Sequence, residues 1–104
     1  MSERQDQTDG AVKERAKTEK KEPTLYKVIL LNDDYTTMEF VLQVLESIFD
    51  KSPSEAFQIM MHVHTNGRGV AGIYLWEVAE TKAEAAVSMA RSAGYPLQAV
   101  TEEA

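Results

Sequence analysis

The fold of this chain is decided by one stretch, Leu25-Tyr26-Lys27-Val28-Ile29-Leu30-Leu31-Asn32-Asp33-Asp34-Tyr35-Thr36. Its first seven residues are apolar apart from one lysine, which predicts a buried central strand. The strand stops at three acceptor-rich side chains, and an amphipathic run follows from Met38. An amide and two carboxylates held at such a junction are suited to bind a small cation.

Outward from this stretch, the sequence predicts six elements. A capping box at 36–39 opens a helix whose apolar positions extend to Phe49, and Ser52-Pro53-Ser54-Glu55 opens a second helix that Asn66-Gly67 ends. We expect a strand at Gly69–Glu77, a third helix from Thr81 to Gly94, and a short strand at Leu97–Thr101. The order βααβαβ predicts an α+β fold, in which a three-stranded antiparallel sheet packs against three helices.

The first 22 residues differ in composition from the rest of the chain. They contain six basic and six acidic side chains and one large aliphatic residue after Met1, namely Val12. Such a segment cannot bury enough apolar surface to offset the entropy of ordering, so we expect a flexible N-terminal extension at 1–22 and one folded domain at 23–104.

Charge and composition exclude several classes of function. The net charge of −6 falls on residues 23–104, which argues against nucleic acid and anionic membrane as partners. The chain has no cysteine and hence no thiolate chemistry, and it has no apolar run that resembles a signal peptide or a membrane span. We expect a cytoplasmic protein without a cofactor.

The second predicted helix adds apolar and polar groups on one face. Met60, Val63 and His64 stand at i, i+3 and i+4, and Met38 and Val41 form a similar pair on the first helix. If both helices pack beside the strand, these side chains line an apolar pocket edged by polar groups. Such a pocket suits a ligand that is apolar at one end and cationic at the other.

Other interpretations are open. Asn-Asp-Asp after a strand is common turn chemistry, and methionines at helical spacing are common in cores. A metal enzyme could use His62 and His64 with the aspartates, but i, i+2 residues on a helix point away from each other and no nucleophile has an adjacent base. A general protein-interaction module, with no interest in free N-termini, is the main alternative.

Several motifs together resemble the ClpS family of adaptors, which deliver substrates of the N-end rule to the Clp protease. The resemblance rests on the opening stretch through Val41, on Met60-Met61-His62-Val63-His64, on Glu77-Val78-Ala79-Glu80-Thr81-Lys82 and on Tyr95-Pro96-Leu97. It covers Pro23 to Glu103. Thr37 stands where the family usually has proline, and Arg68 is also less typical.

The resemblance implies a ligand, a partner and a role for individual residues. The ligand is the free N-terminus of a protein that begins with Phe, Tyr, Trp or Leu, and the partner is the N-terminal domain of the ClpA unfoldase. Glu77 and Lys82 would dock on the unfoldase, with no catalytic residue and no metal. The N-terminus would be bound by Asn32, Asp33, Asp34, Thr36, Met38, Val41, Met60, Val63, His64 and Leu97.

Overall fold

The computed structural model describes residues 22–104, and the N-terminal extension expected at 1–22 lies almost entirely outside this part of the chain. The element order is β1 (Leu25–Leu31), α1 (Met38–Ser47), α2 (Pro53–Asn66), β2 (Arg68–Leu75), α3 (Trp76–Ala93) and β3 (Gln98–Glu103). The order and the α+β class confirm the prediction from sequence.

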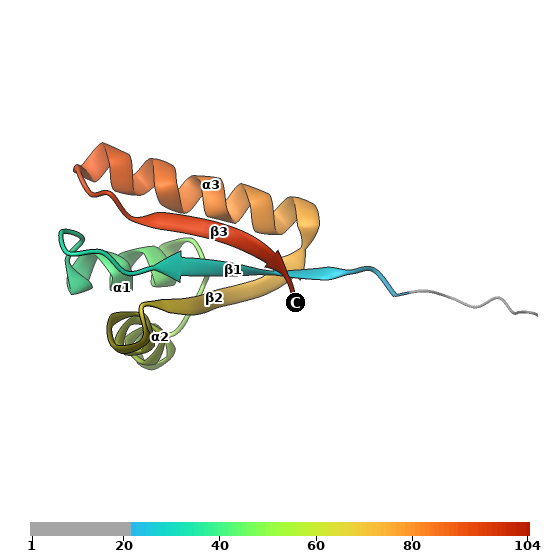
Figure 1. Ribbon diagram of the computed structural model, residues 1–104, viewed down its shortest axis with the longest axis horizontal. Helices are drawn as coiled ribbons and strands as arrows, with labels where there is room; N and C mark the ends of the chain where they lie inside the picture. The colour runs from blue at the N-terminus through green and yellow to red at the C-terminus, as the bar shows by residue number, and fades with distance from the viewer. Residues whose placement is uncertain (1–21) are drawn as a thin grey trace, which may run out of the picture.

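The sheet is antiparallel with β1 at its centre, in the spatial order β2-β1-β3 (Figure 1). A register shift between Val28 and Ile29 leaves Ala71 of β2 unpaired, which is a β-bulge. Beyond it, Ile29 lies opposite both Val70 and Val100. The run 25–31 is therefore the central strand that its apolar character predicted.

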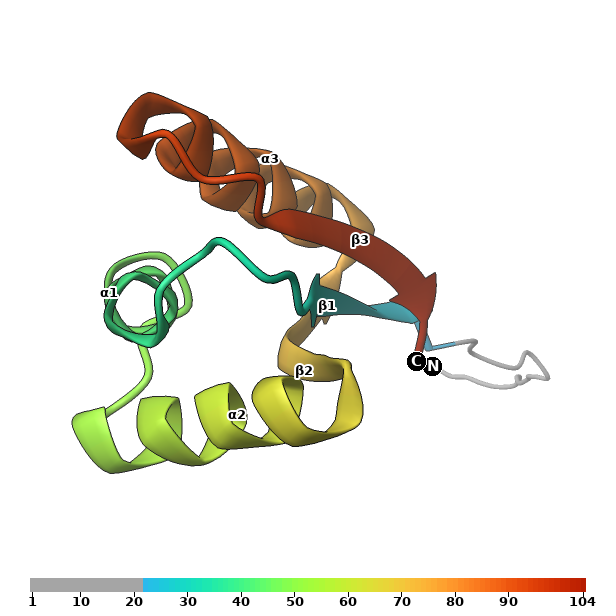
Figure 2. The same cartoon turned by 60° about the vertical axis from the view of Figure 1, so that its left-hand side comes forward.

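The hydrophobic core lies between one face of the sheet and the helices. Figure 2 shows α1, α2 and α3 arranged around the same side of β1. Val28 and Leu30 of β1 are fully buried in this core, whereas Val70, Ile73 and Val100 on the other strands are exposed. Within residues 22–104, no helix combines the length and hydrophobicity needed to cross a bilayer.

The buried residues of helix α3 are all alanines, and Met89 packs against the same core while partly exposed. These alanines are Ala79, Ala83, Ala86 and Ala90, which recur at the three- and four-residue spacing of a single helical face. The buried face of α1 is much larger and consists of Phe40, Val41, Val44 and Leu45. Small side chains let α3 approach the sheet closely, and they bury little apolar area.

The predicted boundaries of β2, α3 and β3 were partly wrong. Strand β2 ends at Leu75 and α3 begins at Trp76, five residues before Thr81. Leu75 occupies the N-cap without a side-chain hydrogen bond, so the usual sequence signal for a helix start is missing here. Strand β3 begins and ends later than predicted, at Gln98 and Glu103. The second capping box, at Ser52 and Glu55, and the helix ends at Gly67 and Gly94 agree with the sequence.

Candidate functional site

The loop after β1 is organised by Asp33. Its Oδ1 accepts hydrogen bonds from the backbone amides of Tyr35 and Thr36, each at 2.7 Å, and its Oδ2 accepts one from the Thr36 hydroxyl at 2.7 Å. A carboxylate that accepts from residues two and three positions ahead fixes a tight turn. Asp33 thus determines the path of the chain from the strand to α1.

The same contacts tune the charge of Asp33. Partial burial alone would raise its pKa, but the hydrogen bonds from Thr36 and Tyr35 stabilise the ionised form, and the guanidinium of Arg91 adds attraction. Together the favourable contacts outweigh burial, so the pKa of the Asp33 carboxyl lies below its ordinary value. Asp33 therefore stays negatively charged at neutral pH.

The first turn of α1 is capped by Thr37, and the capping box predicted for Thr36 and Glu39 was wrong. The Thr37 hydroxyl accepts from the Phe40 amide at 3.1 Å. The Thr36 hydroxyl instead donates to Asp33 in the preceding loop. Two adjacent threonines thus have separate tasks, one in the loop and one at the helix start.

A cavity of about 230 Å³ opens between this loop and the first two helices. Its polar lining comes from the loop and from the last turn of α2, and its apolar lining comes from both helices. Met38 at its wall is 44% exposed, whereas Val41 and Met60 are buried at 7% and 3%. The lining residues are Asn32, Asp33, Asp34, Thr36, Met38, Val41, Met60 and His64.

Val63 and Leu97, the other two residues expected at this site, lie in the hydrophobic core instead of on the cavity wall. Both are buried, at 2% and 1% exposed. Val63 packs toward β2, where a Cβ built on Gly69 would come within 2.7 Å of Val63 Cγ2.

The two histidines of α2 lie on different surfaces. His64 lines the cavity, whereas His62 lies beside Asn66, with 3.2 Å between the side-chain nitrogens, and lines two separate hollows next to Val70. Within residues 22–104, no three side chains of the metal-binding types come together. The geometry therefore gives the metal-enzyme interpretation no support.

Glu77 and Lys82 share one hollow of about 360 Å³ on α3, with Val78 and Thr81. Lys82 is also tied to its own domain. Its ammonium donates to the Ile48 carbonyl at 2.6 Å, lies 3.5 Å from an Asp50 carboxylate oxygen, and sits 5.4 Å from the centre of the Tyr74 ring. Lys82 therefore fastens α3 to the end of α1, which the sequence alone did not indicate.

Comparison with known proteins identifies the family. Residues 21–100 match the family model described as ATP-dependent Clp protease adaptor protein ClpS. The chain belongs to the ClpS family. Two similar relatives are ClpS adapter proteins from Paraburkholderia xenovorans (strain LB400) and Burkholderia mallei (strain SAVP1), which are 50% and 52% identical over 95% of both chains. The chain is therefore an adaptor of the Clp protease, as its resemblance to ClpS implied.

A solved ClpS structure has the same fold. It is Agrobacterium tumefaciens ClpS2 bound to L-phenylalaninamide, with a TM-score of 0.77 and 43% identity over 80% of this chain and all of that one. In our ClpS chain, the two atypical residues both have structural contacts. Thr37 caps α1, and Arg68 forms an ion pair with Glu102 at 2.6 Å on the sheet instead of reaching the cavity.

The role of Arg91 was not predicted from the sequence. Its guanidinium donates to the carbonyls of Tyr95 and Leu97, at 2.8 and 3.2 Å, and its charge favours the ionised form of Asp33. The Tyr95 ring packs on Phe40 of α1, with 4.8 Å between ring centres. A basic residue in the last turn of a predicted helix was the available signal, because such residues often bind nearby carbonyls.

Proposed function

We propose that this ClpS adaptor binds the free N-terminus of proteins that begin with a bulky hydrophobic residue, namely Phe, Tyr, Trp or Leu. The observation that carries the proposal is the cavity next to Asp33, which has two carboxylates at its mouth and two methionines in its wall. A chain N-terminus presents the matching groups, an ammonium and a side chain attached to the same carbon.

The size of the cavity supports a ligand of this kind. At about 230 Å³, it is smaller than the roughly 300–1,000 Å³ of a site for a drug-sized molecule. It therefore suits one side chain with its α-amine. L-phenylalaninamide, to which the Agrobacterium ClpS2 is bound, has a free α-amine, one aromatic side chain and an amide where a peptide would continue.

The polar groups suit an ammonium. The cavity lining includes Asp33 and Asp34, and neither lysine nor arginine. Asp33 gives three acceptor positions to its own loop, of roughly four that a carboxylate offers, and no side chain within residues 22–104 binds Asp34. In our proposal Asn32 and His64 accept from the ammonium, and the aspartates supply its countercharge, one of them through water.

The apolar groups account for selectivity. Met38, Val41 and Met60, together with Thr36, would surround the first side chain, and burying it contributes roughly 1.5–3 kcal/mol. Val63 and Leu97 would act from the core behind them. After the costs of association, affinities in the micromolar range, about −8 kcal/mol, are expected. An adaptor has to release its cargo, so moderate affinity is an advantage.

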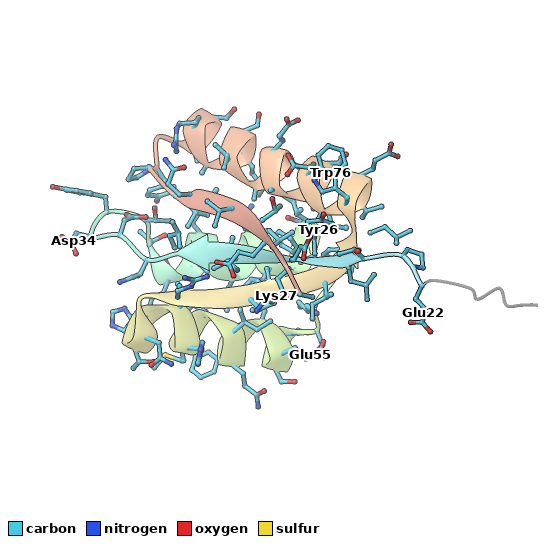
Figure 3. All side chains as sticks on the ribbon, turned by 45° about the vertical axis from the view of Figure 1, so that its right-hand side comes forward. Glu22, Tyr26, Lys27, Asp34, Glu55 and Trp76 are labelled. Carbon is cyan, nitrogen blue, oxygen red and sulfur yellow. The ribbon has the colours of Figure 1, made fainter. Side chains whose placement is uncertain are left out.

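Delivery requires a second surface, and we propose that Glu77 and Lys82 form part of it. Figure 3 shows Asp34 and Trp76 at opposite ends of the molecule, and Trp76 is 53% exposed at the start of α3. Cargo at one end would leave the other end free for the N-terminal domain of the ClpA unfoldase. Residues 1–22 would engage the unfoldase during delivery in the cytoplasm, and residues 23–104 would hold the cargo.

Peptide binding tests this proposal directly. Fluorescence anisotropy is measured with peptides that are identical except for the first residue, together with an N-acetylated form of the Phe peptide. Acetylation removes the cation, so the carboxylate that the bound peptide covers has no partner, which costs on the order of 2–5 kcal/mol. We therefore expect affinity to fall by more than about tenfold. Equal binding of the free and acetylated peptides would contradict the proposal.

A further inference from the structure

Strand β3 has a free outer edge. Among the described residues, β3 has a neighbouring strand only on its β1 side. The Ala104 amide donates to the Leu25 carbonyl at 2.9 Å, so every second residue before it turns its amide toward β1. The amides and carbonyls of Ala99, Thr101 and Glu103 therefore point outward. The strand has no lysine or proline, which commonly protect such edges, so an extended segment can add to it.

A groove of about 590 Å³ follows this edge between β3 and α3, which run alongside each other in Figure 1. Its apolar surface comes from Ala83, Val87, Ala99 and Val100. The α3 side also carries Glu80 and Glu84, and no basic residue lines the groove. Glu80 accepts from the Thr101 hydroxyl at 2.9 Å, which leaves its second oxygen for another donor. The groove thus suits an extended segment with positive charge.

One segment of this chain has that chemistry. Residues 13–17 read Lys13-Glu14-Arg15-Ala16-Lys17, with basic residues at alternate positions. In an extended strand, alternate side chains point to the same side and are about 6.6 Å apart. Glu80 and Glu84 are four residues apart on a helix, where Cβ atoms are separated by roughly 5–6 Å. The two spacings match closely enough for neighbouring charges to pair.

The segment can reach the groove. Seven residues separate Lys17 from Leu25, the first residue of β1, and Leu25 is hydrogen-bonded to Ala104 at the end of β3. At about 3.3 Å per extended residue, the connection spans about 23 Å. Crossing from β1 to the far side of β3 requires two strand spacings, or about 9.6 Å. The connection is therefore long enough to pass around the end of β3.

We propose that residues 13–17 of this chain add to the outer edge of β3 as a fourth strand, parallel to β3. The side chains of Lys13, Arg15 and Lys17 face the acidic side of α3, and backbone hydrogen bonds form to Ala99 and Thr101. This contact would hold the N-terminal extension on its own domain. The inference does not depend on peptide binding at the Asp33 cavity.

Hydrogen exchange at individual amides, followed by NMR on the full chain, tests the contact. The variant K13E/R15E/K17E reverses the three charges, and R4E/K20E/K21E makes the same change in net charge elsewhere in the extension. In the wild type and in the control we expect the amides of Ala99 and Thr101 to exchange several-fold more slowly than in K13E/R15E/K17E. Salt at about 1 M should remove most of this difference, because exposed ion pairs are screened.

A charge swap adds a positive test. E84K alone should speed exchange at Ala99 and Thr101, and combining it with K13E/R15E/K17E should restore part of the protection. Equal exchange in all proteins would overturn the proposal. So would equal loss in both triple variants, which would indicate attraction by net charge alone. Protection that increases with protein concentration would also overturn it, because a second copy would then occupy the groove.

Discussion

Replacing Met38 by alanine tests whether this side chain selects among ligands, which we call a selectivity gate, or is an ordinary core residue. Met38 lines the cavity wall, and in our proposal it flanks the position of the ligand's Cβ atom. Valine and isoleucine carry two heavy atoms on Cβ and are stiff at χ1, so they cannot rotate the extra group away from Met38. Phenylalanine and leucine branch one atom further out and avoid the contact. Wild-type protein should therefore discriminate against N-terminal Ile and Val.

The structure gives the expected size of the changes in affinity and in stability. Overpacking a full site costs about 1–3 kcal/mol, so Phe should bind roughly 5- to 150-fold more tightly than Ile. Met38 is 44% exposed, so the mutation loses about half of the roughly 1.5–3 kcal/mol of a buried side chain, or about 1 kcal/mol. For a domain of this size, 1 kcal/mol shifts Tm by about 4–8 °C. Met60 is 3% exposed, and Met60→Ala should cost about 2–5 kcal/mol.

The assay combines thermal melts with anisotropy titrations of peptides that begin with Phe or Ile. M38A should lower Tm only modestly, bind the Phe peptide somewhat more weakly, and reduce the Phe-to-Ile affinity ratio by about fivefold or more. M60A is the control for a core methionine and should mainly lower Tm. An M38A protein that melts as early as M60A and keeps the wild-type ratio would refute the gate.

Three further predictions concern the loop, the α3 surface and the extension. The folded-state pKa of Asp33 is lowered, so the stability that its carboxylate contributes is present above the ordinary value of 3.8 and is lost as pH falls below it. The free energy of unfolding, measured by urea titration, should therefore fall less on acidification in D33N than in wild type. D34N removes the same charge but none of the loop hydrogen bonds, so it should behave like wild type. K82A should lower the free energy of unfolding by about 1 kcal/mol because the Ile48 carbonyl loses its donor. E77A, at an exposed position, should change it by less than about 0.5 kcal/mol. Equal effects of the two variants would contradict the role of Lys82 in fastening α3 to the end of α1. Deleting residues 1–21 should leave peptide affinity unchanged and slow degradation of an N-degron substrate by the Clp protease, and a truncated protein that no longer binds peptide would show that the boundary at Pro23 is wrong.

The sequence predicted the fold well wherever local chemistry and tertiary structure agree. The apolar run 25–31 contains a single charge, and its bounds match those of β1. Ser52 and Glu55 form both hydrogen bonds of a capping box, and Gly67 and Gly94 end helices with positive φ angles of 90° and 85°. These signals depend on neighbouring residues only, so they can be read without knowing what packs against them.

The errors arose where distant residues decide the structure. Helix α3 begins at Trp76, and no capping residue marks that start. The role of Thr36 depends on Asp33, whose carboxylate takes its hydroxyl. The cavity residues could be named from helical spacing and family resemblance. Only the packed structure shows that Val63 and Leu97 lie in the core and that Lys82 fastens α3 to the end of α1.

The alanine face of α3 has a consequence for how the domain comes apart. The four buried alanine methyls contribute about 0.8 kcal/mol each, or about 3 kcal/mol in all, and the Lys82 hydrogen bond to Ile48 adds about 1 kcal/mol. The large buried side chains of α1 contribute roughly 1.5–3 kcal/mol each. Partial opening of a protein follows its weakest packed unit. Under a pulling force, α3 would separate before β1 and α1 lose their contacts. The adaptor could then yield its outer helix to a machine that pulls on it while the cavity beside Asp33 stays intact.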